Sequence, residues 1–127
     1  MLPLIAVVDD DISVRESLES LIRSVGMEVR VFESAEEFLN SDHPKKPDCL
    51  ILDVRMPGMS GIELHRCLLA RNYNVPVVFI TADGSDVRAR SEASSDYTVA
   101  YLTKPFSEDE LLDSVHAGLR LKSSIQA

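Results

Sequence analysis

The sequence predicts an α/β fold, a doubly wound parallel sheet of five strands with helices on both faces. The first observation is a set of five short apolar runs, and the second is a segment of helical length and period between successive runs. The third is that polar side chains suited to chemistry follow several runs, at the end of the sheet where sites of this class lie. The runs are Leu4–Val8, Val29–Phe32, Cys49–Leu52, Val75–Ile80 and Val99–Leu102.

The apolar runs have the character of buried parallel strands. They are continuous or nearly so and rich in valine and isoleucine, as strands covered on both faces are. Pro76 falls near the start of the fourth run, where a strand tolerates proline. Strands that alternate with helices imply crossover connections of the usual right hand.

Two segments show a clear apolar helical face, and Gly26 supplies the stop of the first one. Four Ser-x-x-Glu capping boxes predict where helices begin. The apolar faces are Val14, Leu18, Leu21, Ile22 and Val25 in the first segment and Leu111, Leu112, Val115 and Leu119 in the last. The boxes are Ser13/Glu16, Ser34/Glu37, Ser60/Glu63 and Ser107/Glu110.

The stretch from Asp83 to Thr98 offers little to bury. Its only apolar candidates are Val87, Ala89 and Ala93, so we predict a short and loosely held helix there. The domain is expected to span residues 1–121. Residues 122–127 are expected to be a fraying tail or the stub of a connector.

Composition limits the classes of protein to be considered. A chain of 127 residues with 45% hydrophobic and 27% charged residues suits one soluble globular domain. The net charge of −8 argues against nucleic-acid binding by this domain, because such surfaces are basic. Cys49 and Cys67 lack metal spacing and are expected to be reduced, buried thiols. The three histidines also lack ligand spacing and are expected to be surface or partly buried residues: His43, His65 and His116.

No apolar run approaches the length that spans a bilayer. The first strand begins at residue 4, which leaves no room for a signal peptide. We therefore expect a cytoplasmic protein without membrane contact.

Carboxylates follow two of the predicted strands. Asp9, Asp10 and Asp11 close the first run, and Asp53 closes the third just before a Met-Pro-Gly turn. Asp11 is expected only to cap the following helix. If the two strands are neighbours, the other carboxylates crowd one place and raise one another's pKa. Such an oxygen-only cluster suits Mg²⁺, and a metal beside an activated aspartate is suited to accepting a phosphoryl group.

Two further strand ends carry candidate groups. Thr81 closes the fourth run, where threonine is common for structural reasons alone, but its hydroxyl could donate to a phosphoryl oxygen. Lys104 precedes Pro105 after the fifth run; such a lysine is usually solvated, but here it could neutralise transferred phosphate. Tyr101 on the same run is by itself an ordinary core or edge aromatic.

The combined motifs resemble the response-regulator receiver domain of two-component signal transduction. They cover residues 4 to about 120, and their sequences are most similar to those of receivers of the nitrogen-fixation-regulator type. The motifs are Val7-Val8-Asp9-Asp10, the segment Leu52 to Gly61 (LDVRMPGMSG), Phe79-Ile80-Thr81-Ala82 and Leu102-Thr103-Lys104-Pro105-Phe106. The resemblance implies a flavodoxin-like (βα)5 fold with strand order 2-1-3-4-5.

The resemblance also assigns roles. It implies that Asp53 is the phospho-acceptor and that Asp10 binds Mg²⁺ directly, with Asp9 assisting through water. The backbone carbonyl of Arg55 would complete the metal site. Thr81 and Lys104 would hold the phosphoryl oxygens, and the Lys104–Pro105 bond would be cis. Thr81 and Tyr101 would form the switch that changes the surface of helix four, strand five and helix five.

The same resemblance implies partners. A sensor histidine kinase, through its phosphohistidine, or a small phosphodonor would supply the phosphoryl group. A downstream effector domain or protein would receive the signal, and a phosphorylation-dependent homodimer is compatible with it. The domain would be a phosphoprotein of a phosphorelay and no enzyme in the usual sense, since it catalyses only its own phosphotransfer and dephosphorylation.

One segment departs from the family pattern. Receivers usually have Ala-Gly-Ala before strand five, but here the segment is Asp96-Tyr97-Thr98. A glycine there would tolerate a positive φ that Tyr97 tolerates poorly. We therefore expect a reshaped, mobile helix four.

Two alternatives remain open at this point. A phosphohydrolase of the haloacid-dehalogenase type would use Asp9 as nucleophile and a late acidic pair, for which only Glu108 and Asp109 are present. A receiver-like module that acts without phosphate is the other alternative, and the full set of five site residues argues against it.

Overall fold

The computed structural model describes residues 2–42 and 45–126, so that expectations about His43 and Ala127 lie outside the described residues. Strands and helices alternate along the whole chain, as predicted. In order they are β1 Leu4–Val8, α1 Ile12–Ser24, β2 Glu28–Phe32, α2 Ala35–Leu39, β3 Cys49–Asp53, α3 Gly61–Ala70, β4 Val77–Thr81, α4 Val87–Ala93, β5 Thr98–Thr103 and α5 Glu108–Gln126.

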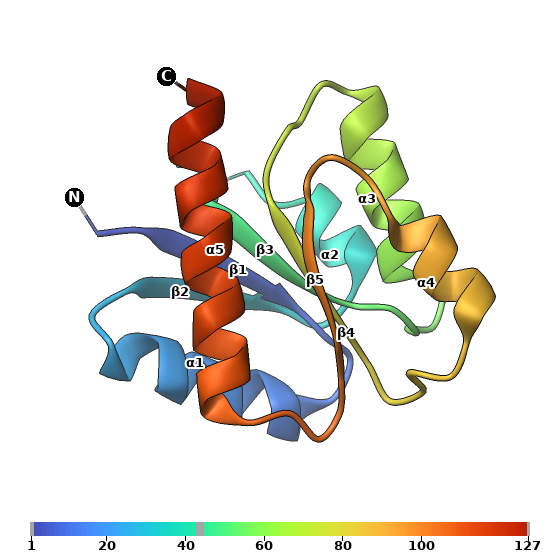
Figure 1. Ribbon diagram of the computed structural model, residues 1–127, viewed down its shortest axis with the longest axis horizontal. Coiled ribbons are helices and arrows are strands. Elements are labelled where there is room, and N and C mark those ends of the chain that lie inside the picture. The colour runs from blue at the N-terminus through green and yellow to red at the C-terminus, as the bar shows by residue number, and fades with distance from the viewer. Residues whose placement is uncertain (1, 43–44, 127) are drawn as a thin grey trace.

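The five strands form one parallel sheet in the order β2-β1-β3-β4-β5. The predicted fold class and strand order are therefore confirmed. Figure 1 shows α5 crossing in front of this sheet and α2 lying behind it. The central position of β1 and β3 places the carboxyl ends of these strands next to each other, which matters for the site below.

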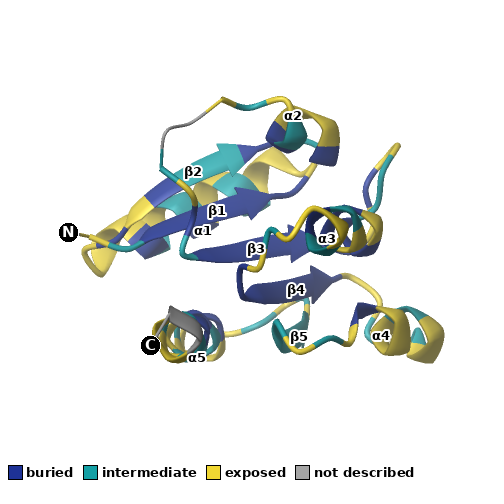
Figure 2. Ribbon diagram, turned by 90° about the horizontal axis from the view of Figure 1, so that it is seen from above, coloured by how far each residue is buried: buried dark blue, intermediate teal, exposed yellow. Residues whose placement is uncertain are grey.

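Side chains that alternate along each strand enter two separate cores, which explains why the apolar runs are continuous. In β1, Ala6 and Val8 pack toward α2 and α3, whereas Ile5 and Val7 pack toward α1 and α5. The same alternation holds in β3 and β4. Figure 2 shows these three strands buried along their length between the helices.

The helix starts agree with the predicted capping boxes at two of four positions in full. Reciprocal bonds join Ser60 with Glu63 and Ser107 with Glu110. At α2 the Ser34 hydroxyl accepts from the Glu37 amide at 3.0 Å. The box expected at Ser13 is wrong, because α1 already begins at Ile12 and Asp11 caps it by accepting a hydrogen bond from the Ser13 amide. The aspartate two residues earlier in the chain takes the N-cap position, so that Ser13 lies inside the first turn of the helix.

The helix α4 is short, as predicted, but its buried face differs from the prediction. Ala93 is buried and Ala89 packs against the core, whereas the Val87 side chain is exposed. Val87 is the first residue of the helix, directly after the cap at Asp86, and projects away from the sheet. At the chain's other end, α5 continues to Gln126, so the segment expected to be a tail is largely helical; the domain boundary at residue 121 stays a prediction.

Among the residues that the structure describes, no helix combines the length and the apolar character needed to cross a bilayer.

Candidate functional site

The predicted site residues meet at the carboxyl end of the sheet. Val8 pairs with Leu52, so Asp9 and Asp53, each one residue further on, lie side by side. Carboxylate oxygens of Asp9, Asp10 and Asp53 all lie within 4.8 Å of one another. The parallel pairing of β1 with β3 thus brings carboxylates from two distant parts of the chain together in one acidic cluster.

Asp9 is the most enclosed member of this cluster. Its side chain is fully buried, and both of its oxygens already accept hydrogen bonds. Oδ1 accepts from the Asp11 amide at 2.8 Å, and Oδ2 accepts from Lys104 Nζ at 3.0 Å. The exposed Asp10 and the neighbouring Asp53 therefore offer the more available oxygens, as expected if Asp9 assists a metal indirectly.

Asp53 ends β3 and is 5% exposed. Burial, followed by the charge of Asp9, raises the pKa of Asp53 to about 7, although Lys104 opposes the shift. A carboxyl group in this position is poised between its neutral and charged forms near physiological pH. A nearby cation would favour the carboxylate, which is the form that can act as ligand or nucleophile.

Lys104, the residue directly after β5, lies close to both buried carboxylates. Its Nζ lies 3.0 Å from Asp9 and 3.8 Å from Asp53. The Lys104 amide donates to the Thr81 carbonyl at 2.7 Å, which fixes the end of β5 beside β4. The bond to Pro105 is cis, as predicted. The ordinary alternative of a solvated lysine is thereby excluded.

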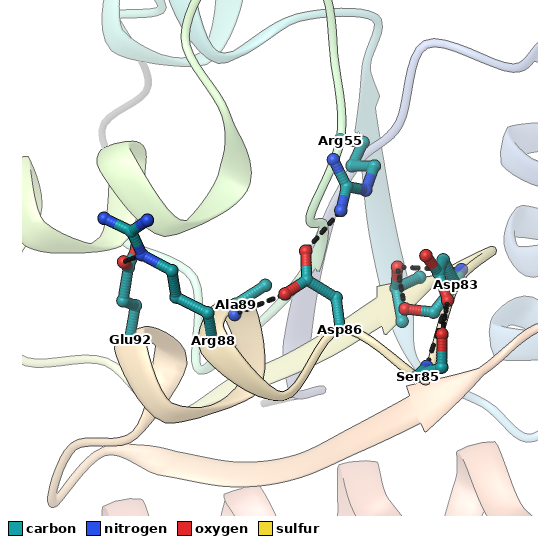
Figure 3. Close-up of polar contacts among 8 residues, drawn as sticks. Arg55, Asp83, Ser85, Asp86, Arg88, Ala89 and Glu92 are labelled. Atoms are coloured by element: carbon teal, nitrogen blue, oxygen red, sulfur yellow. Dashed lines mark hydrogen bonds and ion pairs between the residues drawn. The ribbon is translucent and has the colours of Figure 1, made fainter.

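Thr81 is buried at the end of β4, with its hydroxyl turned toward the following loop. The Asp83 amide donates to the Thr81 Oγ1 at 3.2 Å, and Oγ1 is 3.4 Å from the Asp83 carbonyl. The hydroxyl is thus held by weak local contacts and not by the carboxylates. Asp83 in turn accepts from Ser85, which orders the loop (Figure 3).

Tyr101 of β5 faces the interior beside Thr81. Its ring lies 6.2 Å from that of Phe79, and its hydroxyl is buried without an acceptor or donor at hydrogen-bonding geometry among the described residues. Burial raises the pKa of Tyr101, while the neighbouring Thr81 hydroxyl acts to lower it. The two residues proposed as a switch are therefore neighbours.

Arg55 contributes a contact that the sequence did not reveal. Its guanidinium pairs with Asp86, the residue that caps α4 through the Ala89 amide (Figure 3). Thus the turn after Asp53 is tied to the start of α4. The role expected for the Arg55 carbonyl stays a prediction.

The turn after Asp53 also explains why glycine is needed at its far end. A Cβ on Gly61 would lie 2.2 Å from the Asp53 carbonyl oxygen, so no other residue fits without displacing the backbone. The Gly61 amide donates to the Val54 carbonyl at 3.1 Å. These contacts hold α3 close to the acidic cluster.

The cluster fits a hard divalent cation. Three carboxylates lie within 4.8 Å, and the neighbouring cation, Lys104, bonds to Asp9 and lies further from Asp53. Oxygen-only ligands of this kind suit Mg²⁺ better than softer metals. Burial first, and the charge of Asp9 second, raise the pKa of Asp53, so a bound cation would favour its charged form.

Sequence reasoning found the members of the cluster but missed their surroundings. It did not identify the Asp86 and Asp83 contacts of the loop before α4, nor the burial of His65. The cluster could be predicted because its residues follow the ends of strands, and the carboxyl ends of parallel strands lie at the same edge of the sheet. An aspartate three residues before Ala89 could have indicated the Asp86 cap, whereas its ion pair with Arg55 depends on tertiary packing.

Comparison with known proteins adds an independent line of evidence. The sequence profile of the response regulator receiver domain matches residues 5–116. Nodulation protein W of Bradyrhizobium diazoefficiens is 46% identical over 114 residues, which are 90% of this chain and 50% of that protein. Response regulator protein TodT of Pseudomonas putida is 43% identical over 118 residues, which are 93% of this chain and 52% of that protein. The chain thus spans about half the length of the curated relatives it matches.

Solved structures agree. The response regulator StyR is 46% identical with a TM-score of 0.86, over 99% of this chain and 63% of that one. The structure described as FixJ-N is 32% identical with a TM-score of 0.84, and the match covers 94% of this chain and 95% of that chain. These findings favour the receiver over the haloacid-dehalogenase alternative.

Proposed function

Because the chain belongs to the response regulator receiver domain family, we propose that it is a phosphorylation-dependent signalling switch with Asp53 as the phospho-acceptor. The observation that carries the assignment is the position of Asp53, at a strand end within 4.8 Å of two more carboxylates and facing Lys104. Asp9 is the poorer nucleophile, since both of its oxygens accept hydrogen bonds.

The proposed reaction is a direct transfer. A carboxylate oxygen of Asp53 attacks the phosphorus of a phosphohistidine in a sensor kinase, or of a small phosphodonor such as acetyl phosphate. A new O–P bond forms as the P–N bond, or the P–O bond of the small donor, breaks. The leaving imidazole takes up a proton. The product is an aspartyl phosphate, which water later hydrolyses.

Two residues support the transferred group. Lys104 provides a positive charge close to the attacked phosphorus, and Thr81 is suited to donate its hydroxyl to a phosphoryl oxygen. To do so Thr81 gives up its weak contacts with Asp83, at 3.2 and 3.4 Å. Such long bonds cost little to exchange for a charge-assisted one.

The acidic cluster is proposed to hold Mg²⁺. Asp10, Asp53 and the Arg55 carbonyl would be its protein ligands, with Asp9 assisting through water. The bound ion would offset the charge of the carboxylates and the incoming phosphoryl group. The donor chemistry, oxygen throughout, suits this ion.

The output is proposed to pass through Thr81 and Tyr101. Movement of the Thr81 hydroxyl toward phosphate would open space beside the Tyr101 hydroxyl, which is buried and lacks a hydrogen-bond partner in the described residues. A new position of the ring would change the surface formed by α4, β5 and α5. Phosphorylation would thus change the relative populations of two conformations of the domain.

The proposed setting is the cytoplasm, with a sensor histidine kinase upstream and an effector domain or protein downstream. This domain would contact neither nucleic acid nor membrane, and phosphorylation could promote a homodimer. Its chemistry would be confined to its own phosphorylation and dephosphorylation. The receiver would occupy residues 1–121.

The direct test is labelling with acetyl phosphate followed by mass mapping of the modified residue. We expect Mg²⁺-dependent labelling of Asp53, loss of labelling in Asp53→Asn and full labelling in the control Asp113→Asn, whose side chain is exposed on α5. Phosphate on Asp9 would instead support the hydrolase, and no Mg²⁺-dependent labelling would support a phosphate-independent module.

A further inference from the structure

A cavity of about 260 Å³ lies beside α2, and none of the residues of the acidic cluster lines it. The cavity is a consequence of the short α2, which has five residues and covers little of the face formed by β1 and β2. Space remains between these strands, α2 and the carboxyl end of α3. The cavity is therefore separate from the site already described.

The walls of the cavity are largely apolar. Phe38 of α2 meets Tyr73 edge to face with ring centroids 6.3 Å apart, and Leu68 of α3 adds aliphatic surface. Aromatic edges and aliphatic groups of this kind accept a flat apolar body.

The rim of the cavity is cationic in a chain whose net charge is −8. Arg30, Lys45, Lys46 and Arg71 line it, and no acidic side chain does so among the described residues. Lys45 pairs with Glu28 at 3.7 Å, whereas Lys46 lies over the Tyr73 ring at 4.2 Å. Because Glu28 partly offsets the charge of Lys45, the local field that favours an anion comes mainly from Arg30, Lys46 and Arg71.

Arg30 gives the most specific indication. Its Nη1 is buried and has no hydrogen-bond acceptor in the part of the chain that the structure describes. A buried donor without an acceptor is costly, and a carboxylate is the partner that a guanidinium binds best. The unsatisfied donor lies on β2 at a cavity with an apolar interior.

We propose that this cavity binds a small organic carboxylate with a flat apolar body. The carboxylate accepts hydrogen bonds from Arg30 at the rim, and the apolar body lies against Phe38, Leu68 and Tyr73. An ordered water could also satisfy Arg30, but it would give no preference for a carboxylate. The selectivity of binding therefore separates the two explanations.

The experiment is a titration of the chain with benzoate, followed by amide and methyl chemical shifts. We expect saturable shifts at millimolar benzoate that concentrate at Phe38, Leu68 and Tyr73. Benzyl alcohol keeps the ring and lacks the charge, and acetate keeps the charge and lacks the ring. Both are expected to bind more weakly than benzoate.

Two variants complete the test. Arg30→Gln is expected to weaken benzoate binding by about tenfold, the loss typical of one charge-assisted hydrogen bond. Arg120→Gln, an exposed arginine on α5, is the matched control and keeps the full affinity. Undiminished Mg²⁺-dependent labelling of Arg30→Gln by acetyl phosphate would show that the variant is folded.

Several results would overturn the proposal. They are shifts that do not saturate, shifts scattered over surface lysines, equal binding of benzyl alcohol, and unchanged affinity of Arg30→Gln. If Arg30→Gln does not fold, Lys46→Gln replaces it, because the Lys46 side chain is exposed; unchanged affinity there, together with equal binding of acetate, counts against the site in the same way.

Discussion

The Nε2 atom of His65 in α3 lies 2.9 Å from the Oγ atom of Ser95, in the segment that joins α4 to β5. His65 is 3% exposed, and its ring meets Phe79 at a centroid distance of 5.6 Å. Burial lowers the pKa of His65, so the ring is neutral at pH 7 and suited to share a hydrogen bond with a hydroxyl. The expected surface or partly buried histidine is instead a core residue.

The same serine also takes part in the hydrogen bonds that end α4, at the segment where the family pattern led us to expect a glycine. Ser95 Oγ also contacts Thr98 Oγ1 at 3.0 Å and accepts from the Tyr97 amide at 3.2 Å. Thr98 Oγ1 donates to the Ala93 carbonyl at 2.6 Å, which satisfies an end of α4. Tyr97 is not among the described residues with positive φ. Side-chain hydrogen bonds thus end the helix where a glycine commonly would.

Ser95→Ala should therefore destabilise the fold by about 1–3 kcal/mol, because it leaves the buried His65 nitrogen without its partner. Unfolding in urea, monitored by circular dichroism, measures the change. Ser91→Ala, at an exposed position of α4, is the matched control and should change stability by less than about 0.5 kcal/mol. Equal stability of both variants would show that the contact contributes nothing.

Removal of the Asp53 carboxylate should stabilise the protein at alkaline pH. The folded-state pKa of Asp53 is raised from 3.8 to about 7, so the folded state holds a proton that the unfolded state has lost. The stability of the unmodified protein must then fall as pH rises through that window. Without Mg²⁺, Asp53→Asn should melt several degrees higher near pH 8, and the difference should vanish near pH 4.

Thermal melts in the presence of a chelator test this expectation, with Asp113→Asn as control for the loss of one acidic charge from an exposed position. A stabilisation of Asp53→Asn that is the same at both pH values would mean that the carboxyl group is not held in an unfavourable charged state.

The fold was predictable because a strand that is buried on both faces of the sheet is apolar at consecutive residues, which is visible in the sequence. The runs ending at Val8 and Leu52 match β1 and β3 within one residue at each end, and alternation into two cores accounts for them. Errors occurred where neighbours in space decide the outcome. Val87 is apolar yet exposed, and His65 is polar yet buried, because α3 and α4 are placed by packing that no local pattern encodes.

The acidic cluster was predictable for a related reason. Parallel register brings Asp9 and Asp53 together once their strands are neighbours. The local sequence could not indicate that both oxygens of Asp9 are engaged, since one partner, Lys104, is 95 residues away. The partner of Arg55 is likewise distant in sequence, at Asp86.

Mg²⁺ should stabilise the folded chain, because the cluster of three carboxylates exists only in the folded state. At a concentration about 100 times the dissociation constant, the free energy of unfolding should rise by about 2.7 kcal/mol. Melts with and without Mg²⁺ measure this, and Asp10→Asn should lose most of the effect. An unchanged melting temperature at millimolar Mg²⁺ would contradict the metal site.

Lys104→Gln should separate metal binding from phosphorylation. Lys104 Nζ lies 3.0 Å from Asp9 and 3.8 Å from Asp53, so it competes with any cation for these carboxylates. Without it, Mg²⁺ should bind about 3–10-fold more tightly, as expected for removal of one nearby positive charge at partial solvent screening. Labelling by acetyl phosphate should nevertheless slow, because the charge that offsets the phosphoryl group is gone.

Lys122→Gln is the control for this experiment, because it also removes one lysine that pairs with an aspartate, but away from the acidic cluster. Lys122 pairs with Asp48, and the Asp48 carboxylate also accepts a hydrogen bond from the amide of Leu4, the first residue of β1. It should lower stability and leave both the affinity for Mg²⁺ and the labelling rate unchanged. Isothermal titration and timed labelling measure the two quantities for Lys104→Gln separately. Weaker Mg²⁺ binding in that variant would mean that Lys104 organises the carboxylates and does not compete with the ion.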